Sequence, residues 1–125
     1  MQNPNFFSLK FSDGEDVVGG ILNFAKEKEI EYGEIVSGRG KIRDFELVST
    51  GQKRALDRLF YAESFSISAI SGKLHSIKGE MTHSINVSIT KSGYNATKGQ
   101  LLKATADGPV ELTIRKVNLG KIIEA

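Results

Sequence analysis

The beginning of the chain changes from a strand-like to a helical hydrophobic pattern. An apolar stretch over 6–11 predicts a short strand, and the polar DGED segment follows it. Asp13 is expected to cap a helix, with Glu15 and Asp16 in its first turn, where the helix dipole favours negative charge. Apolar residues at helical spacing then predict the buried stripe of that helix, which consists of Val17, Ile21, Phe24 and Ala25.

The middle of the chain follows a period of two and predicts strands. Ile35 lies in one strand and residues 42–47 in another, with a bend or bulge over 37–40, where two glycines occur. Residues 59–61 form a short apolar stretch. A further strand begins at Phe65, changes phase at Ile70 and is expected to end at the following Ser-Gly pair.

The last third of the chain predicts a hairpin and a final strand. Ile85, Val87 and Ile89 alternate with polar residues, and the turn at 92–95 leads into a strand that contains Leu101. The Asp-Gly-Pro sequence at 107–109 predicts another turn, followed by alternating apolar residues over 110–117. One helix packed against a bent, mostly antiparallel sheet is the simplest assembly of these elements, so we predict an α+β fold.

Composition agrees with a single domain over residues 1–125. The chain is 39% hydrophobic and 26% charged, which is typical of a globular protein. Without cysteine, a disulfide, a thiolate nucleophile or a cysteine zinc site is excluded. The chain starts without a basic, apolar leader and has no apolar run of about 18 residues, so we expect a cytoplasmic protein with no membrane contact.

Charge is distributed unevenly along the chain. Residues 1–35 carry a net charge of −4 and the remainder +6, within a total of +2. If the basic residues gather on one folded surface, they would attract anions such as nucleic acid. Acidic residues lie among them, so an ordinary solvated surface is the alternative. The candidate nucleic-acid contacts are Arg39, Lys41, Arg43, Arg54 and Arg58.

Enzyme signatures are missing from the sequence. It contains no nucleophile elbow, phosphate-binding loop, zinc-protease motif or dinucleotide fingerprint. Asp13 and Asp16 could form an acid pair, but their position at the start of a helix favours capping over catalysis. We therefore predict no catalytic residues and no cofactor.

The order of several motifs resembles a known family. The capped DGED helix start is followed by Ile-Glu-Tyr-Gly-Glu-Ile at 30–35 and by the Gly-Arg-Gly bend at 38–40. The strand at 65–72 and the Lys-Gly-Gln-Leu segment at 98–101 come next. Together they resemble the PPC domain ("plants and prokaryotes conserved"), also described as a PD1-like DNA-binding domain, over about residues 6–117.

The resemblance implies a compact α+β domain that assembles as a homotrimer through its sheet. In plants the domain accompanies AT-hook segments in nuclear DNA-binding proteins, whereas in bacteria and archaea it usually stands alone with no assigned reaction. Residues 37–41 match an AT-hook only loosely, because its second Arg and its Pro are absent. Any DNA affinity is therefore expected from phosphate contacts on the folded surface, and it should be salt-sensitive.

The resemblance also implies the position of a degenerate metal site. Members of the family often carry His-x-His on the first strand of the hairpin and a third His on the second. Ser84, Asn86 and Gln100 occupy those positions, and they are weak ligands for transition metals compared with imidazole. We predict no metal there, and a polar niche in which Asn86 and Gln100 bond to each other or to the backbone. His83 is one residue out of phase, unless a bulge brings it inward.

We therefore expect a non-enzymatic DNA-associated or regulatory protein that acts as a homotrimer. The alternative is a small-ligand-binding protein or an unrecognised enzyme, with a polar pocket at a subunit interface around His83, Asn86, Tyr94 and Gln100. An assembly scaffold without a ligand is a third possibility.

Overall fold

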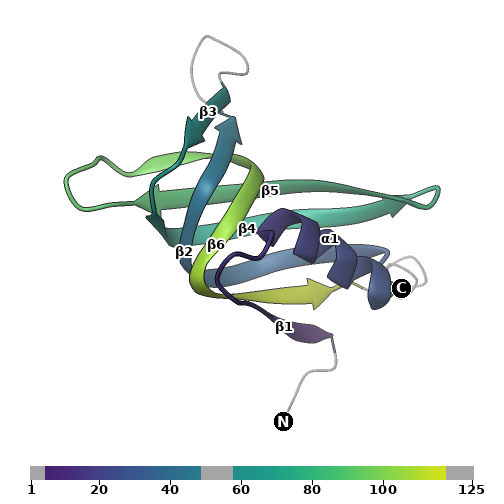
Figure 1. Ribbon diagram of the computed structural model, residues 1–125. Helices are drawn as coiled ribbons and strands as arrows, with labels where there is room; N and C mark the ends of the chain where they lie inside the picture. Colours follow the sequence, from purple (N-terminus) through teal and green to yellow (C-terminus); the bar gives the residue numbers. More distant parts are fainter. Residues whose placement is uncertain (1–4, 49–57, 118–125) are drawn as a thin grey trace.

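The computed structural model describes residues 5–48 and 58–117. Within these ranges the chain forms six strands and one helix, which are labelled in Figure 1. In chain order they are β1 (Phe6–Phe11), α1 (Val17–Glu27), β2 (Tyr32–Val48), β3 (Arg58–Tyr61), β4 (Phe65–Ile77), β5 (Glu80–Thr90) and β6 (Thr97–Lys116).

The strands form one antiparallel sheet that closes on itself. Their order is β1-β6-β5-β4-β2-β3, and β6 also pairs with β2. Strands β2 and β6 are long and bent, so each takes part in two portions of the sheet. The first half of β6 pairs with β5 and β2. The second half of β6 pairs with β1 and β2. The extra pairing joins β2, β4, β5 and β6 into a ring (Figure 1).

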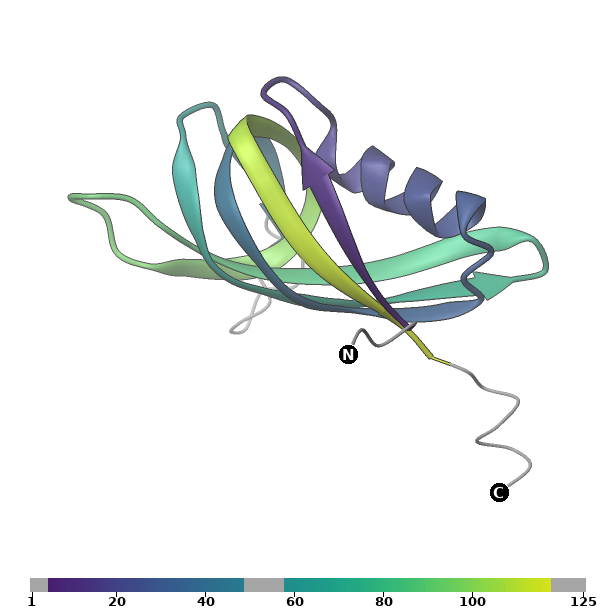
Figure 2. The same cartoon turned by 90° about the horizontal axis from the view of Figure 1, so that it is seen from below.

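Helix α1 lies on the inner side of this curved sheet (Figure 2). Val17, Ile21 and Ala25 are fully buried, as the helical spacing predicts, and they belong to the same core as the inward-facing residues of the strands. Phe24 is only partly buried and packs edge-to-face on Phe7, with 5.6 Å between ring centroids. The predicted α+β fold is therefore confirmed. No helix within the described residues is long and apolar enough to span a membrane.

The start of α1 differs from the prediction. The N-cap is Asp16, whose Oδ1 accepts a hydrogen bond of 3.1 Å from the Gly19 amide, and the first turn contains no acidic residue. Asp13 lies before the helix, because Gly14 takes a positive φ of 89° and the backbone of Asp16 pairs with Thr105 of β6. The sheet thus determines where the chain enters the helix.

Two predicted strand ends are also wrong. Strand β4 does not end at the Ser71-Gly72 pair but continues to Ile77. Gly72 allows β4 to lie very close to β5, because a Cβ on Gly72 would be only 2.5 Å from the Ser84 carbonyl oxygen. Strand β6 likewise continues through the predicted turn at 107–109 and only bends there, where Gly108 has a φ of 87°. In β2, the predicted bend at 37–40 is a pair of register shifts within one strand.

Candidate functional site

Strands β4, β5 and β6 carry small polar side chains on the face away from α1. Ser84 and Asn86 are exposed and Ile85 between them is buried, because successive side chains of a strand point to opposite faces. Asn86 lies opposite Ser71 of β4 and Gln100 of β6. The Gln100 amide donates a 3.4 Å hydrogen bond to the Ser84 hydroxyl. The structure thus brings together Ser84, Asn86 and Gln100, the three positions at which the family resemblance implied a degenerate metal site.

Two adjoining hollows open on this face, with volumes of about 730 and 290 Å³, and they share Ser71 and Asn86. Such volumes are typical of small-molecule sites, which occupy roughly 300–1,000 Å³. The larger hollow is lined by Phe6, Glu34, Ile35, Val36, Ser71, Gly72, Lys73, Ser84, Asn86 and Arg115. The smaller is lined by Ala69, Ile70, Ser71, Asn86, Val87, Ser88, Lys98 and Gly99.

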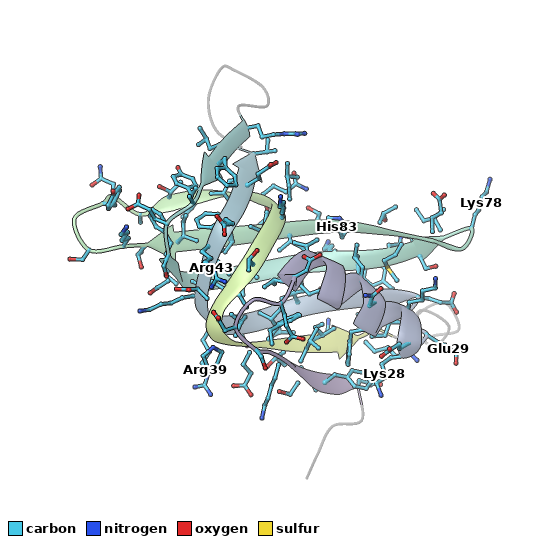
Figure 3. The ribbon with its side chains drawn as sticks, in the orientation of Figure 1. Lys28, Glu29, Arg39, Arg43, Lys78 and His83 are labelled. Carbon is cyan, nitrogen blue, oxygen red and sulfur yellow. The ribbon has the colours of Figure 1, made fainter. Side chains whose placement is uncertain are left out.

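His83 does not belong to this polar face. It lies opposite the buried Leu74, on the side of the sheet that carries the core, as its position out of phase predicted (Figure 3). Strands β4 and β5 pair without a register shift in this region, so no bulge turns His83 towards Ser84. Its Nδ1 atom is buried and has no hydrogen-bond partner among the described residues.

Tyr94 also lies apart from Asn86, in the loop between β5 and β6. Its ring packs edge-to-face on Phe65 at 5.5 Å, and its hydroxyl is 3.4 Å from Glu63. Lys91 donates a 2.6 Å hydrogen bond to the same carboxylate, which lowers the pKa of Glu63 and raises the pKa of Lys91. Neither hollow is lined by Tyr94 or His83, so within one chain these two residues lie apart from the hollows beside Asn86.

Arg43 is part of a structural ion-pair network. Its Nη1 atom donates 2.8 Å hydrogen bonds to Asp13 and Asp107 and a 3.2 Å bond to the Ala106 carbonyl. Asp13 also accepts the Gly108 amide at 2.8 Å. The Arg43 bond lowers the pKa of Asp13, while bonds from Ser64 and then from Arg43 lower the pKa of Asp107.

The local sequence pattern does not predict this network, because the two carboxylates lie 30 and 64 residues from Arg43. The only local signal is that both carboxylates belong to Asp-Gly pairs, Asp13-Gly14 and Asp107-Gly108, which favour tight bends.

The other candidate nucleic-acid contacts differ in how their charge is compensated. Arg39 donates to Glu111 at 2.7 Å and thereby lowers the pKa of that carboxylate, yet the Arg39 side chain remains 83% exposed. Arg58 is 3.9 Å from Glu46. Lys41 is exposed and forms no ion pair within the described residues. Arg39 and Arg43 both lie near the bends of β2 and β6 (Figure 3). Arg54 falls outside the described residues.

Nearly the whole chain matches the model of one known protein family. The model of the Plants and Prokaryotes Conserved (PCC) domain matches residues 1–118. The chain belongs to the PCC family. This is the family, also written PPC, that the order of motifs indicated. The comparison with curated proteins gave no match.

Solved structures similar to this PCC domain share its fold. A "putative DNA binding protein" from Bacteroides thetaiotaomicron has a TM-score of 0.82 and 24% identity, covering 94% of this chain and 82% of that chain. The metal-containing protein AF0104 from Archaeoglobus fulgidus has a TM-score of 0.78 and 24% identity, covering 89% and 78%. A plant- and prokaryote-conserved protein from Pyrococcus horikoshii has a TM-score of 0.77 and 18% identity, covering 90% and 79%.

The polar face of this PCC domain does not fit a tightly bound transition metal. Ser84, Asn86 and Gln100 offer hydroxyl and amide groups in place of imidazoles, and these are weak ligands. Lys73 lies directly opposite Ser84 and would repel a cation. Among the described residues no three His, Asp or Glu side chains are grouped so that they could hold a metal ion.

Proposed function

We propose that this PCC domain is a non-enzymatic, DNA-associated or regulatory protein of the cytoplasm that acts as a homotrimer. The observation that carries the proposal is its similarity, over 94% of the chain, to the Bacteroides thetaiotaomicron protein described above as DNA-binding. A protein from Ralstonia eutropha with the same description has a TM-score of 0.77.

The outer bend of β2 is the surface best suited to phosphate contacts. Lys41 carries no compensating carboxylate in the described structure, and the Arg39 guanidinium reaches solvent while it bonds to Glu111. Lys10 lies 3.9 Å from the same carboxylate, so Lys10 and Arg39 share one acid there. Arg43 is less suited, since Asp13 and Asp107 already occupy its guanidinium.

Fluorescence anisotropy with AT-rich and GC-rich duplexes, at low and near-physiological salt, tests this role. Binding that persists at the higher salt supports it. Replacing Arg39→Gln and Lys41→Gln together should weaken binding to both duplexes and make the slope of log K against log salt shallower by about 2, because each lost phosphate contact contributes roughly 0.9.

The matched control replaces Lys26→Gln and Lys78→Gln. These are two exposed lysines on α1 and in the β4–β5 turn, and neither forms an ion pair within the described residues. The control should bind like the wild type. Absence of binding at either salt concentration, or equal weakening in both double variants, would contradict the assignment.

A small-ligand-binding role is the second candidate, and the hollows beside Asn86 favour it. The larger has a volume of about 730 Å³ and combines polar side chains with Phe6 and Val36. Ligand sites commonly combine an apolar lining with a few convergent polar groups in this way.

A further inference from the structure

Asn86 lies at the centre of a grid of eight positions on three strands. Lys73, Ser71 and Ala69 of β4 lie opposite Ser84, Asn86 and Ser88 of β5. Gln100 and Lys98 of β6 lie opposite Asn86 and Ser88. The two lysines therefore occupy opposite corners of the grid, one beside each hollow.

The grid is rich in hydrogen-bond donors that have no partner. Neither Lys73 nor Lys98 forms an ion pair in the described part of the chain, and the side chains of Ser71 and Asn86 form no hydrogen bond there. Hydroxyl and amide groups can each donate a hydrogen bond, and a lysine ammonium can donate three. All of these groups border the same two hollows.

Apart from Lys73, the charged residues that line the larger hollow are Glu34 and Arg115, and their charges cancel. Glu34 is the only carboxylate among the described residues that line either hollow, and Arg115 of β6 holds it through an Nε bond of 3.0 Å and an Nη2 bond. With that pair neutral, Lys73 and Lys98 leave the grid with a positive charge of about two. A cation is disfavoured there, and an anion is favoured.

We propose that this grid, the anion niche, binds a small anion with several oxygen atoms, a phosphate or a carboxylate group, centred on Asn86. Adjacent strands are separated by about 4.8 Å, and alternate residues of one strand by about 6.8 Å. The corners are thus near enough for both flexible lysine side chains to reach one ligand above Asn86. Charge-assisted hydrogen bonds of this kind are roughly twice as strong as neutral ones. The inference rests on the second candidate function and is independent of DNA binding.

Isothermal titration calorimetry of the full chain with inorganic phosphate and with succinate, at constant ionic strength set by chloride, tests the niche. We expect saturable binding of at least one of the two, and the stronger one identifies the anion class. Lys73→Gln with Lys98→Gln, and separately Asn86→Ala, should each weaken binding about tenfold or more. The lysines and Asn86 are exposed, so these variants are expected to fold, which circular dichroism checks.

The matched control is again Lys26→Gln with Lys78→Gln, which removes the same charge elsewhere and should leave the affinity unchanged. Absence of saturable heat with both anions, or equal weakening in the control, would overturn the proposal. A competition experiment distinguishes the source of the anion. If saturating phosphate displaces a DNA duplex at constant ionic strength, the niche contacts nucleic acid and the small-ligand assignment is wrong. If DNA binding fails while phosphate binds, the inference stands without the DNA-associated function.

Discussion

Arg43 joins three separate segments of the chain through one guanidinium group. It connects β2 to Asp13 in the segment before α1 and to Asp107 at the bend of β6, and its Nε atom lies 3.8 Å from Asp44. Two backbone hydrogen bonds also join the segment before α1 to β6, from the Gly14 amide to the Ala106 carbonyl and from the Ala106 amide to the Glu15 carbonyl. The residue is therefore better explained as a structural clamp than as a phosphate contact.

The clamp predicts a pH-dependent stability. Hydrogen bonds to Arg43 and its neighbours hold the pKa of Asp13 and of Asp107 below the ordinary value of 3.8. Carboxylates with a lowered folded pKa stabilise the fold above their unfolded pKa, and this contribution is lost as the pH falls through the folded pKa. Arg43→Met should therefore lower the urea midpoint near pH 7, and the difference from wild type should shrink as the pH falls below 3.8.

Lys41→Met is the control for the clamp, because Lys41 is an exposed cation of the same strand without an ion pair in the described residues. Its urea midpoint should follow the wild type at every pH. An Arg43→Met variant that differs from wild type equally at both ends of the pH range would show that the carboxylates do not contribute.

At the scale of elements, the close contact between β4 and β5 determines where the side chains of the anion niche lie. Gly72 lies opposite Ile85, between the rows that contain Ser71 and Lys73, and it gives the strands room to pair there. A Cβ at this position would also be 3.1 Å from the Ile85 Cα, so the clash is with backbone that cannot rotate away. Any side chain there must separate the two strands.

Gly72→Ala should therefore destabilise the protein by roughly 1–3 kcal/mol, as overpacking usually does. It should also weaken phosphate binding, since the register that aligns Lys73 with Ser84 is disturbed. Ser71→Ala is the control for stability, because the neighbouring Ser71 side chain is exposed and its Cβ already fits. Urea denaturation measures both, and equal midpoints for the two variants would show that the strands have room for a side chain.

At the scale of the molecule, the closed ring of strands leaves an outer face with exposed apolar side chains. Phe6 of β1 is 42% exposed and Val36 of β2 is 47% exposed, and both line the larger hollow. Val36 points outward because it follows the buried Ile35 on β2, and successive side chains of a strand point to opposite faces. Apolar side chains on an exposed sheet face are typical of an interface between subunits.

For the proposed homotrimer we expect a mass by light scattering of about three times the 13.7 kDa of one chain. Val36→Lys should lower that mass, because a charge would be buried without a partner at the interface. Phe60→Ser, on β3 and outside the residues that line the larger hollow, should leave the mass unchanged. A wild-type mass of a single chain would contradict the trimer.

The sequence by itself determined the features that depend on local periodicity. The buried stripe of α1, the alternation of Ser84 and Asn86 with Ile85, and the hairpin of β5 and β6 follow from residues within a few positions of one another. The order of motifs was enough to identify the family, and the phase of the strand placed His83 on the opposite face.

Only the tertiary structure decided which residues contact across long separations. Asp13 could cap a helix by its position, but it accepts from Arg43 and Gly108 instead, and Asp16 caps α1. Lys73 and Lys98 frame the anion niche only because the register aligns β4, β5 and β6. Register depends on how the whole core packs, and a shift of one residue would turn every side chain of a strand to the other face.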